Sequence, residues 1–522
     1  MLRTDNSSCG PKNFGVSGNL QAFRMLTELR DTANSYPHDA ISKLSDDVLL
    51  VIFHFYLEKA FVRGGRAYDG WHDLVHVCRR WRCLVFASPG HLDLRLLCSR
   101  RTPRRLLDIW PALPIVVQDR ARSSDYWGIW GMTNTIAALD QHNRVCKIEL
   151  YPTPNSQLDY LIAMRKPFPV LTDLELRSTG PAAPILPDSF LGGSAPRLQS
   201  LKLQRIPFPS LPRLLCSTTD LVSLHLFEIP RSGYISPVAI ATALSMLTRL
   251  KSLHLDFNPS LPSAHVALQS QLPLKRIILP ALTEFYLWSE SGYMEDMVST
   301  IDTPLLNVAR IAFSGQPDSD TPLLRDFISR TEVFNELHRA KVAISMNSVH
   351  LTLSRMNKGP DDKMLKLRFS CSALDWRFSS LAQIFNSLLP PLPALEYLEV
   401  FTDQLYWRSN MENAQWLGLL RPFFSVKNLV LFDDLVRYVA PALKELTGER
   451  VSEVLPALQN VFLKGSRPSA PSKPVQEALE QFVVARQLSG RPVVLHYWGY
   501  RLERGARRVG EWMVLHKSSY SQ

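Results

Sequence analysis

The sequence contains no uninterrupted apolar run long enough to cross a bilayer as a helix, and its opening residues, MLRTDNSSCGPKNFG, hold no apolar segment of the secretory kind. No membrane association is therefore expected. The seven cysteines are odd in number, lie far apart and include no C-x-x-C pair, which argues against a disulfide framework, a zinc knuckle and a redox dithiol. A reducing compartment, cytoplasmic or nuclear, fits this usage best.

Catalytic motifs are also missing. The sequence lacks G-x-x-x-x-G-K-[ST], G-x-G-x-x-G, H-E-x-x-H, G-x-S-x-G and the kinase loop sequences. Its paired acids, Asp46–Asp47, Asp361–Asp362 and Asp433–Asp434, lie at expected helix starts or turns, where carboxylates serve as caps or as solvated charge. We therefore predict a protein that is not an enzyme, with no catalytic residue, no metal and no cofactor.

What the sequence does contain is enough apolar surface for a large folded chain. Hydrophobic residues make up 46% of its 522 residues and charged residues 20%, and this length predicts several domains or a repeat array. The net charge of +11 permits binding to acidic partners or nucleic acid, but the basic groups at Arg79–Arg82, Arg100–Arg105 and Arg501–Arg508 are short and scattered. Nucleic-acid binding is therefore a minor alternative.

Changes in composition and in hydrophobic periodicity along the chain predict four parts. Residues 1–40 form a partly ordered N-terminal extension, residues 41–98 a helical domain, residues 99–470 a repeat array, and residues 471–522 a cap of one helix and one strand. The cap helix is expected over residues 474–490, because Pro474 opens the amphipathic segment and Gly490 follows it.

The helical domain begins at LSDDVLLVIFHFYLEK. Ser45 is a good N-cap, and the apolar residues Val48, Leu49, Ile52, Phe53 and Tyr56 mark one helical face. Glycines within residues 62–70 then interrupt the pattern. A second helical stretch is expected from Trp71 to about Ala87.

That second stretch reads WHDLVHVCRRWRCLVFA. Projected as one helix, it places Trp71, Leu74, Val77 or Cys78, Trp81 and Leu84 on an apolar face, and His72, His76, Arg79 and Cys83 on the opposite stripe. His72 and His76 have the spacing of zinc ligands, but the Arg79 guanidinium between them and Cys83 opposes a bound cation. We interpret the stretch by its tryptophans rather than by its cysteines.

The array is built from short self-similar segments of the form apolar-x-x-apolar-x-apolar. Twelve copies start at Val145, Leu171, Leu198, Leu221, Leu250, Leu282, Val308, Met346, Met364, Leu395, Val426 and Leu458. Their starts average about 28 residues apart, as in leucine-rich repeats. The copies at Met346 and Met364 are the weakest, whereas a recurring Pro-x-Leu lead-in at Pro196, Pro280, Pro393 and Pro456 supports a true repeat.

The alternative fold is a doubly wound α/β domain, which is disfavoured because no strand is followed by a glycine-rich phosphate turn. The predicted fold class is therefore α/β: a small three-helix domain followed by an irregular leucine-rich-repeat solenoid, or horseshoe, with short strands and helix or loop spacers. In leucine-rich repeats an asparagine is expected three positions after the last apolar residue of the pattern. Only the copy at Leu250 has one, Asn258, so no continuous asparagine ladder is expected along the turns of the array.

The segments LSDDVLLVIFHFYL, W-x-x-L-x-x-V-C-R-R-W-R-x-L-V and SPGHLDLRLL together resemble an F-box, and the array resembles the irregular leucine-rich repeats of the large fungal group of F-box proteins. The resemblance implies a break near Cys78 that divides the second stretch into two helices. The family's usual Leu-Pro opening is Leu44–Ser45 here, and the glycine-bearing link is long.

This resemblance implies a substrate-recognition subunit of a Skp–cullin–F-box ubiquitin ligase, which binds a Skp-type adaptor and, through it, a cullin. The implied positions of the helical unit and its adaptor-binding surface are Leu44, Leu49, Ile52, Phe53, Val77, Cys78, Trp81 and Leu84. The rival function is a repeat scaffold outside any ligase, with a degenerate F-box, and Ser45 favours this rival.

In x-Leu-x-Leu strands the leucines point inward and the residues between them face the concave side. These positions are charged in the first repeats, at Asp173, Glu175, Arg177, Lys202, His225, His254 and Asp256. In the later repeats they are aromatic, and we predict that an unidentified protein substrate binds there, at Tyr286, Trp288, Tyr397, Phe401, Phe432 and Phe462. The alternative is that loops or the C-terminal helix cover these rings as ordinary core.

Overall fold

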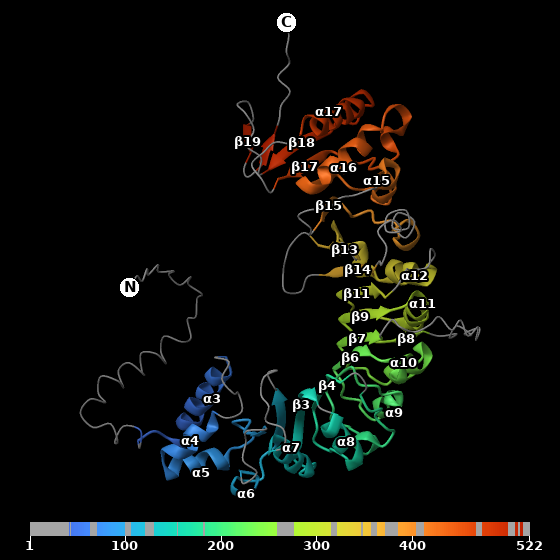
Figure 1. Cartoon of the computed structure of the whole chain (residues 1–522). Helices are drawn as coiled ribbons and strands as arrows, with labels where there is room; N and C mark the ends of the chain where they lie inside the picture. Colours follow the sequence, from blue (N-terminus) through green and yellow to red (C-terminus); the bar gives the residue numbers. More distant parts are fainter. Residues whose placement is uncertain are drawn as a thin grey trace, which may run out of the picture. The chain divides into compact units, whose positions relative to one another are not determined.

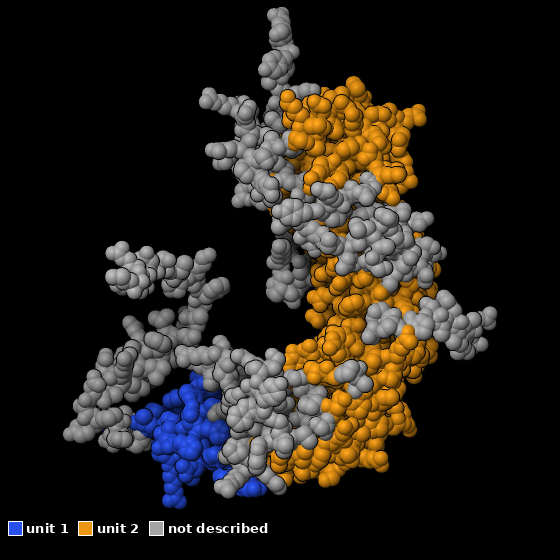
Figure 2. Space-filling view, viewed as in Figure 1, with its two compact units in different colours: residues 1–97, 108–114 blue, residues 98–107, 115–522 orange. Residues whose placement is uncertain are grey.

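The computed structural model describes residues 41, 43–62, 70–99, 106–120, 130–153, 155–180, 183–257, 276–314, 321–345, 348–355, 363–370, 385–402, 412–465, 472–498, 507–509 and 512–514. The predicted extension over residues 1–40 lies outside this set, as do Asn258 and most of the arginines of the groups 100–105 and 501–508. Contacts divide the chain into two compact units (Figure 2). Unit 1 holds the residues up to Leu97 together with Asp108–Pro114, and unit 2 holds Cys98–Leu107 and the chain from Ile115 onward.

Unit 1 is built on three helices, α3 (Asp46–Val62), α4 (Trp71–Val77) and α5 (Arg79–Ala87). Ser45 caps α3 as expected, since its Oγ accepts a hydrogen bond from the Val48 amide at 3.4 Å. The core is small and apolar. Its buried side chains include Leu49, Phe53, Trp71, Leu74, Val75 and Val85.

The projection of one continuous helix from Trp71 to Ala87 is wrong. Cys78 has φ −157° and ψ 170°, an extended conformation that ends α4, and its Sγ accepts a hydrogen bond from the Trp81 amide at the start of α5. Two arginines of α5 bind the neighbouring helices. Arg82 donates to the Val75 carbonyl of α4 at 2.9 Å, and Arg80 donates to Asp46 of α3 at 2.7 Å. These arginines therefore join the helices of unit 1 rather than only facing solvent.

Unit 2 is a row of short strands with helices on one side of it (Figure 1). Its row contains β2 (Ile115–Arg120), β3 (Val145–Thr153), β4 (Asp173–Ser178), β5 (Ser200–Gln204), β6 (Ser223–Ile229), β7 (Ser252–Phe257), β9 (Glu284–Ser289), β11 (Val308–Phe313), β12 (Arg339–Ile344), β13 (Ser348–Ser354), β14 (Met364–Ser370), β15 (Tyr397–Thr402), β16 (Asn428–Phe432), β17 (Asn460–Lys464) and β18 (Val494–Trp498). All twelve predicted copies of the repeat contain one of these strands.

The recurring proline before the strands has a local cause. A turn precedes β5, in which the Leu198 amide donates to the Ala195 carbonyl at 3.1 Å, and Pro196 occupies its second position. Proline is favoured there because its fixed φ matches the turn. The same turn precedes β9, β15 and β17, with Pro280, Pro393 and Pro456 in the same place.

One backbone carbonyl per repeat then sets the register of the next strand. The Thr172 carbonyl accepts hydrogen bonds from two successive amides of the following repeat, Gln199 at 2.8 Å and Ser200 at 3.0 Å. The pattern recurs down the row, with the carbonyls of Gln199, Val222, Lys251, Thr283, His338, Glu396 and Lys427 as acceptors. Equivalent residues of neighbouring strands are consequently paired, as Leu201 is with Leu224 and Leu224 with Leu253.

The strand order departs from the chain order at one place. After β11 the row continues with β14, β13 and β12 before it reaches β15. β13 runs antiparallel to both of its neighbours, while β14 is parallel to β11 and β12 is parallel to β15. The copy at Met364 therefore continues the parallel array, and the copy at Met346 forms the reversed strand.

The helices of unit 2 follow one another along one side of the row, and successive helices pack together. They are α7 (Trp130–Asp140), α8 (Asn155–Met164), α9 (Leu211–Leu215), α10 (Pro237–Leu244), α11 (Ser291–Thr300), α12 (Pro322–Arg330), α13 (Glu332–Asn335), α15 (Asn413–Leu420), α16 (Asp433–Lys444) and α17 (Lys473–Leu488). Shorter elements are α6 (Leu106–Ile109), η1 (Phe190–Gly193), η2 (Arg231–Gly233), η3 (Gly448–Ser452), β1 (Leu96–Cys98), β8 (Ile277–Ile278), β10 (Ile301–Asp302), β19 (Arg507–Val509) and β20 (Trp512–Val514). A mixed α/β solenoid of the leucine-rich-repeat kind results, rather than a doubly wound sheet with helices on both faces.

Helix α17 and strand β18 follow the last repeat. Gly490 ends the helix with φ +74°, the left-handed conformation that favours glycine just beyond a helix. Arg486, near the end of α17, is fully buried, and its guanidinium donates to the carbonyls of Val451 at 3.0 Å and Leu458 at 2.9 Å. The α17 side chain thereby satisfies carbonyls of the repeat beneath it.

Replacing Arg486 with methionine should lower the free energy of unfolding by about 3 kcal/mol, because it leaves buried carbonyls without donors. Urea unfolding followed by tryptophan fluorescence measures this change. Arg491→Met is the matched control, since Arg491 is exposed and reaches only the Pro456 carbonyl, at 3.4 Å. Equal losses of unfolding free energy in the two variants would show that the buried contacts of Arg486 contribute no more to stability than the exposed contact of Arg491.

Candidate functional site

Helix α3 carries apolar side chains on two opposite faces. Leu49 and Phe53 are buried in unit 1, and the Phe53 ring lies 4.7 Å from that of Trp81. Away from this core, the aliphatic and phenylalanine side chains of Val48, Val51, Ile52 and Phe55 are between 39% and 55% exposed, and Tyr56, which donates its hydroxyl to Asp73, is 41% exposed. The spacing of the first four places them on one helical face, which we call the α3 stripe. A helix that is apolar all round normally has partners on both sides.

The eight positions implied by the F-box resemblance fall into three groups. Leu49 and Phe53 are buried, so they serve the core of unit 1 and do not form its surface. Leu44, Trp81 and Leu84 are partly exposed, and Ile52, Val77 and Cys78 are exposed. Val77 and Cys78 lie at the corner between α4 and α5. Val48, Val51 and Phe55 belong to the exposed surface as well, although Val51 and Phe55 were outside the predicted helical face.

The histidines of the second stretch do not form a metal site with Cys83. The His72 ring stacks on Trp71 at 3.9 Å between centroids, whereas Cys83 lies on α5, beyond the corner. Among the residues that the structure describes, no group of three or more histidines, cysteines, aspartates or glutamates is arranged to hold a metal ion.

The residues between the inward leucines line one side of the row in unit 2, which we call the strand face. At its start charges are paired within the face: Lys147 contacts Glu149 at 2.8 Å, and Lys202 lies 4.0 Å from Glu175. Arg177 lies over the Tyr151 ring at 4.6 Å. This part of the strand face carries charged residues, and its two lysines lie beside carboxylates.

The strand face carries aromatic rings already on β6 and β7, before Tyr286 and Trp288 of β9. Phe227 on β6 lies 4.0 Å from His254 on β7, which in turn stacks on Tyr286 of β9 at 3.7 Å. His225 completes this ring cluster and lies 3.0 Å from Ser252 Oγ through its Nε2. The strand register pairs His225 with His254 and His254 with Tyr286, so these three rings form a continuous row, and Phe227 packs beside it.

The other predicted substrate residues, Tyr397, Phe401, Phe432 and Phe462, lie on β15, β16 and β17. Phe401 and Phe432 are 5.7 Å apart, and Phe462 stacks on His496 at 4.5 Å. The ammonium groups of Lys341 and Lys464 lie over Phe401 and Phe432, at 4.4 Å and 4.9 Å. All four rings are partly exposed, so none is ordinary core.

The six predicted substrate residues are therefore not one site. Tyr286 and Trp288 are separated from the later rings by the four strands β11, β14, β13 and β12. This interval carries three cations that the sequence interpretation missed: Arg310, which is exposed, and Lys366 and Arg368, which are partly exposed. The signal was present, because they occupy the x positions of the repeats VARIAF and MLKLRF.

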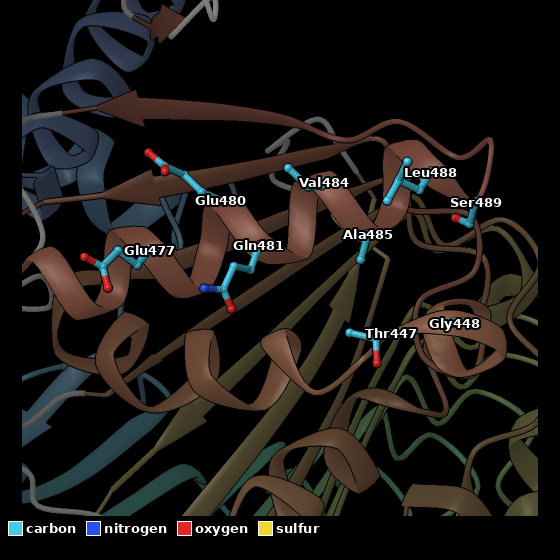
Figure 3. A pocket seen from close by; sticks show the side chains of 9 residues that line it. All are labelled: Thr447, Gly448, Glu477, Glu480, Gln481, Val484, Ala485, Leu488 and Ser489. Carbon is cyan, nitrogen blue, oxygen red and sulfur yellow. The ribbon is translucent and has the colours of Figure 1, made fainter.

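A groove of about 600 Å³ lies between α17 and the turn at Thr447 and Gly448 (Figure 3). Val484, Ala485 and Leu488 form its apolar part, and Glu477, Glu480 and Gln481 its polar part; Thr447 and Gly448 lie opposite Leu488 and Ser489. The polar side chains are spread along one helix and do not converge on a point, as they do in sites for small ligands.

Comparisons with known proteins do not identify a family for this chain. No family model matches the chain, and no curated protein matches it. Among solved structures, a leucine-rich repeat-containing protein of Legionella pneumophila, LegL7, is similar at 11% sequence identity and a TM-score of 0.25; the match covers 74% of this chain and 97% of that protein. Over the described residues, no helix has the length and apolarity needed to span a membrane.

Two groups of the strand face, the partly buried His254 and the buried Asp256, have pKa values shifted from their ordinary ones. Burial lowers the pKa of His254 to about 3, with the positive charges of His225 and Arg310 adding to the effect. Burial also raises the pKa of Asp256, which is 6% exposed, to about 6. Both residues lie on β7, two positions apart, so their effects on stability can be separated by substitution.

The two groups should give pH dependences of opposite sign. Between its ordinary 6.5 and about 3, His254 takes a proton only in the unfolded chain, so its contribution to stability is lost as pH falls. Asp256 holds its proton up to about pH 6 only in the folded chain, so its contribution is complete below 3.8 and is lost as pH rises through 6.

We therefore expect His254→Gln to reduce the loss of unfolding free energy on acidification from about pH 6 to about pH 4, and Asp256→Asn to enlarge it. Urea titrations at several pH values measure both slopes. Slopes that change in the same direction in the two variants would contradict this assignment.

Proposed function

We propose that this protein is the substrate-recognition subunit of a Skp–cullin–F-box ubiquitin ligase. Unit 1 binds a Skp-type adaptor and, through it, a cullin, and the strand face of unit 2 holds a protein substrate. The observation that carries the proposal is the α3 stripe: four large apolar side chains in helical register, exposed on a small unit whose core is formed by the opposite face of the same helix.

Burial of this stripe against a partner is favourable. Each large apolar side chain contributes about 1.5 kcal/mol or more when it is removed from water. Contiguous apolar surface of this kind marks protein interaction sites on folded proteins. Val77 and Cys78, exposed at the α4–α5 corner, add to the apolar surface that unit 1 offers.

The serine in place of the family's usual proline is compatible with this role. Ser45 starts α3 through a side-chain cap, and Arg80 ties the start of α3 to α5 by donating to the Leu44 carbonyl at 2.6 Å. Hydrogen bonds thus hold the start of the helix in place, whereas a proline would do so because its ring restricts φ.

The protein itself would carry out no bond chemistry and need no cofactor. By holding a substrate on unit 2 and an adaptor on unit 1, it would raise the concentration of the substrate near a ubiquitin-carrying enzyme. Its working compartment would be the cytoplasm or the nucleus.

Replacing Val51 and Phe55 together with lysines should reduce retention of a purified Skp-type adaptor by about 100-fold, because two anchors of the stripe become charged. Pull-down and calorimetry measure the loss. The fold should survive, since both side chains are exposed. Leu49, by contrast, is unsuitable for this test because it is buried in unit 1.

The matched control is Val238→Lys together with Met246→Lys in unit 2, since Val238 is 49% exposed where Val51 is 51% exposed. The control should bind the adaptor as the unaltered chain does. Failure of the unaltered chain to retain adaptor and cullin would favour the scaffold outside any ligase. Salt-sensitive retention on immobilised nucleic acid would favour the basic nucleic-acid-associated alternative.

A further inference from the structure

The cations of the strand face are distributed unevenly between paired and unpaired positions. On β12 and β15, Arg339 and Lys341 both contact the buried Glu399 carboxylate, at 2.6 Å and 3.9 Å. On β11 and β14, Arg310, Lys366 and Arg368 have no carboxylate of the described residues within ion-pair distance. The unpaired charges thus gather on two adjacent strands, between the two groups of aromatic rings.

The register places two of these cations directly opposite each other. Arg310 of β11 is paired with Lys366 of β14 in the parallel ladder, and both point to the strand face. Like charges opposite each other on adjacent strands, about 4.8 Å apart, destabilise a sheet. A ligand that brings negative charge to this place removes the repulsion.

Arg368 is held in place by its neighbours. Ala312, 3% exposed, lies between Trp288 and Arg368 in register, and its small side chain lets the guanidinium reach across to the tryptophan. The Arg368 Cζ lies 5.4 Å from the centroid of the Trp288 ring. Cation–π contact orders the arginine without neutralising it.

We propose that Tyr286, Trp288, Arg310, Lys366 and Arg368, the basic site, bind an extended acidic segment of a partner protein. This specifies the substrate class for the strand face and rests in that respect on the function proposed above. Alternate residues of an extended peptide project on the same side, so a segment with acids at alternate positions can reach several of these cations.

A protein segment fits better than nucleic acid. Single-stranded nucleic acid needs aromatic faces on which bases can stack. Here the Tyr286 ring already stacks on His254, and the Trp288 ring carries the Arg368 guanidinium.

The full chain should bind a short fluorescein-labelled peptide with glutamate at alternate positions, measured by fluorescence anisotropy, and not its glutamine counterpart. Binding should weaken as salt is raised, because the contacts are between charges near the surface. A counterpart with phosphoserine at the same positions distinguishes carboxylate from phosphate as the source of the negative charge, and tighter binding of either one supports the site.

The decisive variant is Arg310→Gln, Lys366→Gln and Arg368→Gln combined, which should weaken binding by about tenfold or more. Its control, Arg197→Gln, Arg231→Gln and Lys251→Gln, removes the same charge from exposed positions elsewhere in unit 2 and should change binding less than twofold. Equal losses in both variants, or binding of neither anionic peptide, would overturn the proposal.

A short oligothymidylate that binds more tightly than both peptides, and loses affinity in the decisive variant, would overturn it in favour of nucleic acid. The peptide measurement does not involve the adaptor. An unaltered chain that retains the adaptor but binds neither anionic peptide would therefore reject the basic site alone, and one that binds the peptide but does not retain the adaptor would reject the adaptor assignment alone.

Discussion

The backbone carbonyl that accepts two amides from the next repeat is the interaction on which unit 2 depends. It removes the freedom of each strand to slide along its neighbour, which would otherwise exchange inward and outward side chains. The Thr172 carbonyl accepts the amides of Gln199 and Ser200. As a result, the leucines of β4 and β5 meet in the core, and the residues between them align across the strand face. The row formed by the rings of His225, His254 and Tyr286 is a consequence of that alignment.

The two units present different surfaces because their cores are formed differently. Unit 2 fills its interior with regularly spaced leucines, so the positions between them are free to carry charge and rings. Unit 1 has few elements, and α3 must supply core on one face while leaving Val51 and Phe55 exposed on the other. An apolar surface that excludes water and a charged surface that attracts from a distance can serve partners of unlike chemistry on one chain.

Local patterns in the sequence predicted the parts that local physics decides. Ser45 caps its helix, the Pro-x-Leu lead-in marks a turn, and each leucine pattern contains a strand. The break at Cys78 needed more than periodicity, because both helices beside it continue an apolar pattern. β12 was missed although Leu337 leads it, because the small Ala340 occupies a position that a larger apolar residue fills in most copies of the pattern. The apposition of Arg310 and Lys366 joins residues far apart in the chain, so spacing alone does not reveal it.

The reversed strand order between β11 and β15 changes how the chain reaches its native state. In an uninterrupted solenoid, each new repeat can dock on the preceding one as soon as it exists. Here β11 obtains its second neighbour only when β14 arrives, after the whole β12–β13 segment has been laid down. Bringing β14 to β11 closes a long loop, which costs conformational entropy. The cations of the basic site come together only when β14 pairs with β11.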